Sequence, residues 1–156
     1  IKLGYGDIRP IRLSNPRKAA ICALLLAAAG LAGIGIWPNH LFPLLWVSPL
    51  LILVCLQAFM KERHIFSEMA AGDWRSAVAA ALAALVCGLF WEMWNYFSLA
   101  KWEYSVPLVH RFLIFKMPLL GYGGYLPFGL ECIVIGDMLE KLYNSSILQQ
   151  TNSQPI

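Results

Sequence analysis

Two glutamates stand within long apolar stretches of this chain, Glu92 and Glu131. A carboxylate in an apolar environment is costly, by about 2.5 kcal/mol or more on membrane-insertion scales, so each is expected to have a partner. Such a group can bind a cation, exchange a proton as a general acid or base, or accept hydrogen bonds from the protein itself. Asn95 lies three residues after Glu92, which places its amide on the same helical face.

Three interpretations of the two glutamates stay open. They can be structural, hydrogen-bonded to the backbone of the glycine-rich segment 121–125 or paired with basic side chains of the connection before it. They can form, together with Asn95, a binding site for a cation, a proton or a polar headgroup. They can also be the acid/base pair of an enzyme that acts on a lipid or an isoprenoid. The candidate ion-pair partners are His110, Arg111 and Lys116.

Aromatic residues flank both glutamates and are the candidates for lining a site around them. Rings at these positions can stack on a quinone, a carotenoid or another pigment, but an aromatic belt where a helix meets the membrane surface accounts for them as well. No sequence motif indicates a cofactor, so a bound lipid, quinone or pigment is only compatible with the pattern. The four aromatic candidates are Trp91, Trp94, Tyr122 and Tyr125.

Sequence motifs for metal-dependent or nucleophilic catalysis are missing. The chain contains no His-Glu-x-x-His, Glu-x-x-His or Gly-x-Ser-x-Gly pattern. The cysteines stand singly inside apolar runs, where a free thiol behaves as a small hydrophobe. We therefore assign no catalytic residue and no metal site, and the sequence favours a protein that is not an enzyme without deciding the point.

The amino-acid composition is that of a membrane protein. Of the 156 residues, 13% are charged and 59% are hydrophobic, whereas a soluble domain carries about 25% charged residues. A soluble fold of this size has too much surface relative to its volume to hide so many apolar side chains. The basic residues before the first apolar run lack the interleaved aromatics of a nucleic-acid-binding face, so we expect no nucleic-acid partner.

Interruptions divide the apolar sequence into four expected transmembrane helices. No charged residue occurs between Lys18 and Lys61, a stretch too long for one helix because about 20 residues cross the hydrocarbon core. Pro38 and Pro43 supply the break. The fold class is therefore all-α, a small bundle of about four transmembrane helices. The expected helices cover 19–37, 41–60, 74–98 and 118–143, between a basic N-terminal segment (1–18) and a polar tail (144–156) expected to be disordered.

The last of these spans is expected to be broken by a Gly/Pro-rich segment. Residues 121–127 contain three glycines and end in Pro127, and proline suits the first turn of a helix but not its interior. Regular helix is therefore expected from about Pro127. This start moves Glu131 outward to the depth of Glu92, so that the two carboxyls can share one site.

Small residues at four-residue spacing predict which helix faces pack together. In the third helix Ala80, Ala84 and Gly88 recur every four residues, and the same spacing continues to Glu92. Such stripes let helices approach closely in a membrane, so Glu92 is predicted to face a neighbouring helix. The first helix carries a shorter stripe of the same kind, Ala29 and Gly33.

The distribution of basic residues predicts the orientation in the membrane. With both termini inside, nine Lys and Arg residues lie on the inner side and Lys101, Arg111 and Lys116 on the outer side. Cytoplasmic segments carry the excess of positive charge, so both termini are expected to be cytoplasmic. The expected location is a bacterial inner membrane.

The leading functional hypothesis is a non-catalytic accessory or structural subunit that packs against other membrane helices or lipid. Its small-residue faces and aromatic outer surface suit such contacts. The alternative is a transporter-like or ligand-binding protein whose outer-leaflet site comprises Glu92, Asn95 and Glu131. A further alternative is an intramembrane enzyme acting on a lipid or isoprenoid. Membrane lipids and other membrane-protein subunits are the expected partners.

Overall fold

The computed structural model of this chain describes residues 8–11, 14–104 and 111–152, and it is mostly helical. Two long helical pairs are joined by shorter elements. The elements are α1 (Pro16–Ile34), α2 (Pro38–Leu41), α3 (Leu44–Phe59), α4 (Ile65–Ala71), α5 (Arg75–Phe97), β1 (Leu113–Ile114), β2 (Met117–Pro118), the 3₁₀ helix η1 (Leu119–Gly124) and α6 (Tyr125–Asn152).

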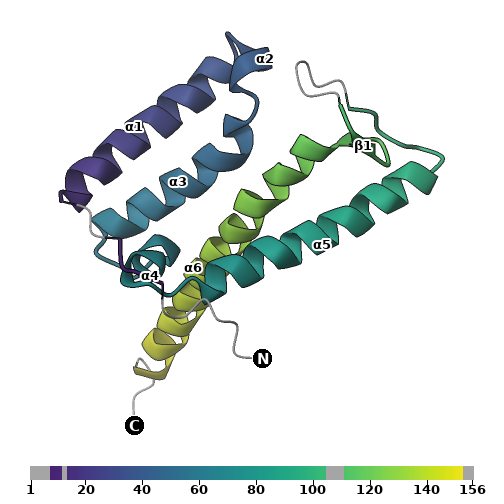
Figure 1. Ribbon diagram of the computed structural model, residues 1–156. Coiled ribbons are helices and arrows are strands. Elements are labelled where there is room, and N and C mark those ends of the chain that lie inside the picture. Colours follow the sequence, from purple (N-terminus) through teal and green to yellow (C-terminus); the bar gives the residue numbers. More distant parts are fainter. Residues whose placement is uncertain (1–7, 12–13, 105–110, 153–156) are drawn as a thin grey trace.

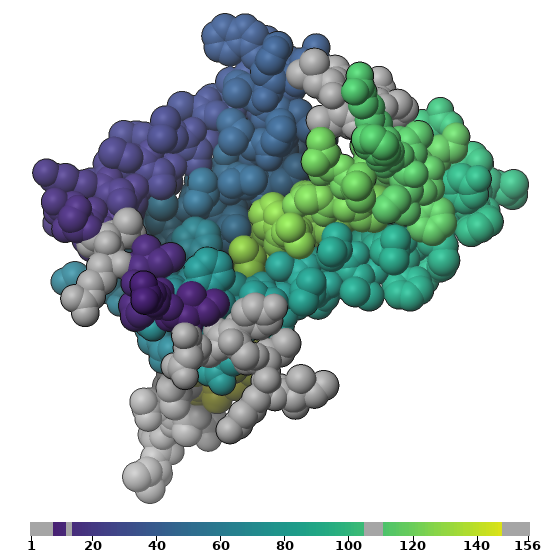
Figure 2. Space-filling view, viewed as in Figure 1, coloured from purple at the N-terminus to yellow at the C-terminus, as the bar shows by residue number. Residues whose placement is uncertain are grey.

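The two helical pairs lie side by side, α1 with α3 and α5 with α6, and α3 contacts α6 (Figure 1). They converge at the end where α4 lies and diverge toward the end that carries α2 and β1. The space-filling view shows the half formed by α1–α3 in purple and blue against the teal and green half formed by α5 and α6 (Figure 2). One cluster of buried residues joins the pairs near α4. Its members are Leu50, Val54, Ile65, Ala77 and Val134.

Three helical segments in the described part of the chain are long and apolar enough to cross a membrane, namely Pro16–Ile34, Arg75–Phe97 and Leu119–Ile147. These segments indicate a membrane protein. The expected count of four spans is not confirmed, because α3 has 16 residues and is therefore about 24 Å long at 1.5 Å per residue. It starts later than expected because α2 and a turn at Pro43 occupy the first residues of that stretch.

The small-residue stripe of α5 packs against α6, as predicted. A Cβ atom added to Gly129 of α6 would overlap the backbone oxygen of Ala80 and the side chain of Ala84. A Cβ atom on Gly88 would lie 2.5 Å from the Tyr125 ring. One turn further along the same face, Glu92 is completely buried, which confirms that it faces a neighbouring helix.

The packing face of α1 differs from the expected one. Ala29 is exposed, whereas Ala27 is buried. A Cβ atom on Gly30 would lie 2.5 Å from Leu44, and one on Gly33 would lie 2.7 Å from Leu41. Of the two residues expected on the packing face, Gly33 therefore lies on it and Ala29 does not, and the face also includes Ala27 and Gly30.

The last span contains the expected break, and its helix continues further toward the C-terminus than expected. Residues 119–124 form the 3₁₀ helix, and regular helix starts at Tyr125, which puts Pro127 in the first turn. The segment expected to be a disordered tail instead continues α6 to Asn152. The hydroxyls of Ser145 and Ser146 donate to the carbonyl of Leu142 at 2.8 and 2.9 Å. Both side chains are therefore hydrogen-bonded within the helix.

Both ends of the described chain contact the connection between α3 and α5. His64 caps α4 by accepting a hydrogen bond from the Ser67 backbone at 3.2 Å. The backbone nitrogen of Ile8 donates to Gly72 just after α4, at 3.1 Å. Far along α6, Lys141 donates to Glu62 at 2.7 Å. The first described residues and the C-terminal half of α6 therefore lie at the same end of the bundle (Figure 1).

Candidate functional site

Glu92 is the centre of a buried hydrogen-bond network at the opposite end. It lies in the second-last turn of α5 and has no solvent exposure. Its Oε1 atom accepts the hydroxyl protons of Tyr104, at 2.6 Å, and of Tyr125, at 2.8 Å. Its Oε2 atom is buried without a hydrogen-bond partner in the described structure. The carboxyl is thus satisfied on one oxygen by two neutral donors and unsatisfied on the other.

Asn95 positions the chain that supplies Tyr104. Its side chain is 2% exposed, donates to the Trp102 carbonyl at 3.0 Å and accepts from the Trp102 amide at 2.9 Å. The Trp102 indole nitrogen then donates to the Tyr104 hydroxyl at 2.7 Å. Burial, together with the hydrogen bond to Glu92, raises the pKa of Tyr104 to about 12. Asn95 therefore folds the connection after α5 back over Glu92, and both polar atoms of its side chain are engaged in that fold.

The second tyrosine reaches Glu92 because of a glycine on α5. Gly88 lies one turn before Glu92, and only the absence of a side chain there lets the Tyr125 ring rest against the helix. Tyr122 is also buried, with its ring centre 6.0 Å from that of Tyr125, and its hydroxyl donates to the Ile114 carbonyl at 3.3 Å. Tyr122 supports the wall behind Tyr125 and anchors β1.

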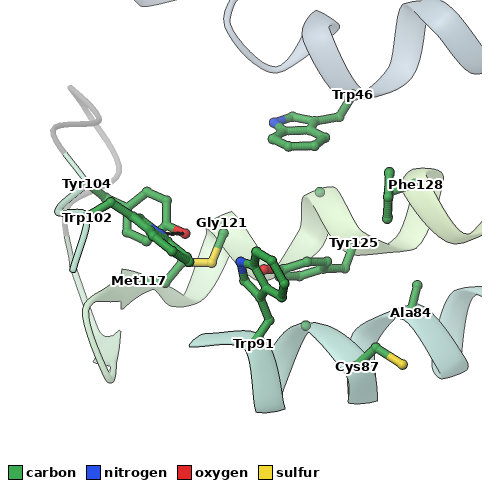
Figure 3. A pocket seen from close by; sticks show the side chains of 12 residues that line it. Trp46, Ala84, Cys87, Trp91, Trp102, Tyr104, Met117, Gly121, Tyr125 and Phe128 are labelled. Carbon is green, nitrogen blue, oxygen red and sulfur yellow. Dashed lines mark hydrogen bonds between the residues drawn. The ribbon is translucent and has the colours of Figure 1, made fainter. Parts of the chain in front are cut away.

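An apolar cavity of about 370 Å³ lies directly in front of this network, between α3, α5 and η1. Tyr104 and Tyr125 form part of its wall, so Glu92 lies behind the wall rather than in it. In Figure 3, Trp46 comes from α3 on one side and Trp91 from α5 on the other, with Tyr125 beside Trp91. We call it the aromatic cavity after the six rings that line it, Trp46, Trp91, Trp102, Tyr104, Tyr125 and Phe128.

A second cavity of about 380 Å³ adjoins the first on the side of α2, and we call it the α2 cavity. His40, Pro43 and Pro118 are among its lining residues. The two cavities share five wall residues, so together they form one cleft between the diverging helical pairs. The shared residues are Trp46, Tyr104, Met117, Gly121 and Gly124.

The structure does not bring Glu131 to Glu92. Gly129 faces α5, and Glu131 lies two residues later, which is about 200° around the axis of α6. Its side chain is half-buried, has no hydrogen bond to any described residue and lines neither cavity. The expectation of a shared site considered only the depth of the two glutamates and left out the rotation of α6.

Of the basic side chains expected as ion-pair partners, the two that the structure describes, Arg111 and Lys116, do not hold Glu92. Lys116 pairs with Glu103 at 3.3 Å, where the two side chains are 37% and 71% exposed. Arg111 is exposed and makes no ion pair with either intramembrane glutamate among the described contacts. His110 lies outside the described residues. Among the described residues, tyrosine hydroxyls take the place expected for the basic groups, and no described cation compensates the charge of an ionised Glu92.

The two predicted tryptophans have different positions. Trp91 lines the aromatic cavity, whereas Trp94 is 64% exposed and lines neither cavity. Four of the six rings of the aromatic cavity were not selected from the sequence, namely Trp46, Trp102, Tyr104 and Phe128. The sequence did contain a signal for Trp102 and Tyr104. They are two residues apart in an extended connection, and side chains at that spacing point to the same side.

The chemistry open to this site follows from its own groups. Among the described residues, no cluster of three His, Cys, Asp or Glu side chains could hold a metal ion. The site offers an apolar, aromatic space, a buried carboxyl and two hydroxyls whose protons that carboxyl accepts. No family model, curated protein or solved structure matches this chain.

Proposed function

We propose that this chain is an integral membrane protein that binds an amphiphile, a molecule with an apolar body and a single polar end, in the cleft formed by the aromatic and α2 cavities. The observation that carries the proposal is the burial of Glu92 behind the wall of an apolar cavity, with two wall tyrosines bonded to it. Ligand sites typically combine a mostly apolar cavity of about 300–1,000 Å³ with a few placed polar groups.

A purely structural role explains the buried carboxyl poorly. An apolar side chain at position 92, with phenylalanines in place of the two tyrosines, would pack between helices without any desolvation cost, whereas a carboxyl with one unpartnered oxygen carries that cost. The cleft beside it is lined by rings and glycines, and an apolar cavity of this kind takes up apolar molecules in preference to water. A ligand that fills the cleft supplies a reason for both features.

The proposed orientation places the cleft near the outer membrane surface. We take α3, together with the turn before it, as a fourth crossing, with both termini in the cytoplasm of a bacterial cell and the chain in its inner membrane. The excess of basic residues at the α4 end supports this orientation. The position of Ile8 and Lys141 near α4 supports placing both termini on one side. Lipid headgroups then lie at the depth of the cleft.

Blocking the cleft tests the proposal. Gly124 lines both cavities, and a Cβ atom there would be in ordinary contact with Trp46 at 3.5 Å, so Gly124→Leu fills the space without a backbone clash. Gly136→Leu is the matched control, because nothing lies within 4 Å of a Cβ atom at Gly136. We expect native mass spectrometry of the protein released from lipid nanodiscs to show a bound amphiphile in the wild type and the control but not in Gly124→Leu.

Two results would contradict this proposal. One is a wild-type protein that carries no bound amphiphile under conditions where it remains folded. The other is a Gly124→Leu variant that retains as much amphiphile as Gly136→Leu, which would place the bound molecule elsewhere on the surface.

A second candidate function is that of an accessory subunit that packs against other membrane helices. The observation that favours it is the uncovered surface of α1, which buries Ala27 alone among its residues although it is long enough to span the membrane. Cys22 is exposed on this helix and provides a site for cross-linking. Cross-linking through Cys22 in native membranes should give a defined heteromeric product if α1 is an interface. A protein that stays monomeric in this assay is not such a subunit.

A further inference from the structure

The polar end of the amphiphile can be inferred from the charge balance around Glu92. No described Lys, Arg or His side chain lines the aromatic cavity or bonds to Glu92. A buried carboxylate without a counter-charge is strongly destabilising. A positively charged group in the cavity would provide that counter-charge from the ligand, on the far side of the two tyrosines.

The walls of the aromatic cavity suit a cation as well. Trp91 and Trp102 form one corner, with ring centres 5.7 Å apart and an angle of 35° between the planes. Trp46 meets Phe128 edge to face, with centres 6.4 Å apart. The faces of tryptophan and tyrosine rings attract cations within about 6 Å, and cages of such rings recognise quaternary ammonium groups.

Hydrogen-bond direction adds a third constraint. Tyr104 and Tyr125 each have one hydroxyl proton, and both protons point to Glu92 Oε1. These hydroxyls can therefore accept a hydrogen bond but cannot donate one to a ligand. A phosphate or carboxylate end would need donors and would be repelled by the carboxylate behind the wall. An ammonium end meets neither obstacle.

We propose that the aromatic cavity binds the ammonium head of a membrane amphiphile, with the six rings as its cage and Glu92 as the buried counter-charge. This inference rests on the proposed function, since it names the head of the molecule whose body occupies the cleft. The α2 cavity, which opens from the same wall residues, holds the first part of the apolar chain.

Lipids that differ only in the head test the inference. The protein is placed in nanodiscs of dioleoylphosphatidylglycerol with a minor fraction of either dioleoyl-trimethylammonium-propane or dioleoylglycerol, and bound lipid is measured by native mass spectrometry. We expect the trimethylammonium lipid to be retained on the order of tenfold better than the neutral one, the ratio for about 1.4 kcal/mol of cation–π and charge interaction. Glu92→Gln should remove most of this preference, and Glu131→Gln, on another face of α6, should preserve it.

A second pair of variants keeps the test decisive if Glu92→Gln does not fold. Trp91→Leu removes one wall of the cage, whereas Trp94→Leu changes an exposed ring of the same helix that lines neither cavity. The preference should fall in Trp91→Leu only. Equal retention of both lipids by the wild type overturns the ammonium inference and leaves the proposed function standing. Retention of neither of these lipids nor of the phosphatidylglycerol overturns both.

Discussion

Both ends of the helical bundle carry ion pairs at the surface, but only one end also buries the carboxyl of a described residue. At the α4 end, carboxylates pair with basic side chains at the surface, as in Arg63 with Glu68 at 3.3 Å and Lys141 with Glu62 at 2.7 Å. At the other end, one carboxyl is fully buried and has tyrosine hydroxyls as its only described partners. The first arrangement neutralises charge where water also screens it. The second leaves a charge to be neutralised by a proton or by a ligand.

The difference shows where the fold buries a carboxyl without a counter-charge from any described residue. Exposed ion pairs contribute about 0–1 kcal/mol each and can be exchanged with little consequence. A buried carboxyl with an orphaned oxygen is retained against its desolvation cost, which is typical of functional positions in membranes. We therefore propose the aromatic end as the functional end of this molecule, whereas the α4 end holds the helices together through its apolar core.

The largest effect on stability is expected from the substitution Glu92→Leu. The substitution leaves the hydroxyls of Tyr104 and Tyr125 buried without an acceptor, at about 1–3 kcal/mol for each. We expect a loss of about 2–5 kcal/mol in the free energy of unfolding, measured by thermal unfolding in mild detergent. Glu92→Gln keeps an acceptor oxygen and should lose much less.

The control for this comparison is Glu131→Leu, at a half-buried position without a described hydrogen bond. It should change stability little. A Glu92→Leu protein that is as stable as the wild type would show that the network adds nothing to the fold. The contrast between the two ends would then be one of function alone.

A smaller loss of stability is expected from Gly129→Val, which pushes α6 away from α5 at the contact that positions Glu92. A Cβ atom there meets the backbone oxygen of Ala80, which cannot move aside as a side chain can. Overpacking of this kind costs about 1–3 kcal/mol. Gly136→Val is the matched control on the same helix, with open space around its Cβ atom. Equal melting temperatures for the two variants would mean that α5 and α6 do not pack at Gly129.

Helical periodicity predicted one part of this site well. The range 74–98 expected for the third helix matches α5 within one residue at each end, because polar residues flank an uninterrupted apolar run. The four-residue stripe ending at Glu92 predicted its burial for the same reason, since a regular helix fixes which side chains share a face. The glycines before Pro127 likewise predicted the irregular start of the last span.

Other parts of the site depend on features that periodicity does not contain. The partner Tyr104 lies in a connection whose path is set by the bonds of Asn95 to Trp102, and no repeat encodes them. The rotation of α6 was fixed by Gly129 against Ala80, which requires knowing that these two residues meet. Trp46 joins the site only through the packing of the two helical pairs. Such long-range contacts are tertiary information.

The smallest effect on stability is expected from a change in pH, and the two ends should respond at different pH values. The hydrogen bonds from Arg75 lower the pKa of Asp73 to about 2 at the α4 end, whereas burial and Glu92 raise that of Tyr104 to about 12. A lowered pKa stabilises the folded state above the unfolded value, about 3.9 for Asp, and that contribution is lost as pH falls toward 2. A raised pKa stabilises it below the unfolded value, about 10 for Tyr, and that contribution is lost as pH rises toward 12.

Acid should therefore loosen the α4 end first and alkali the aromatic end. Tyrosinate absorbance during alkaline titration should show a late-titrating fraction that becomes smaller in Tyr104→Phe, and the release of a bound amphiphile should follow that late step. Asp73→Asn, which removes the Asp73–Arg75 pair without acid, should leave the amphiphile bound, because that pair lies far along α5 from the cavity. Release of the amphiphile from Asp73→Asn would show that the two ends are coupled, and the division of the molecule into a holding end and a binding end would fail.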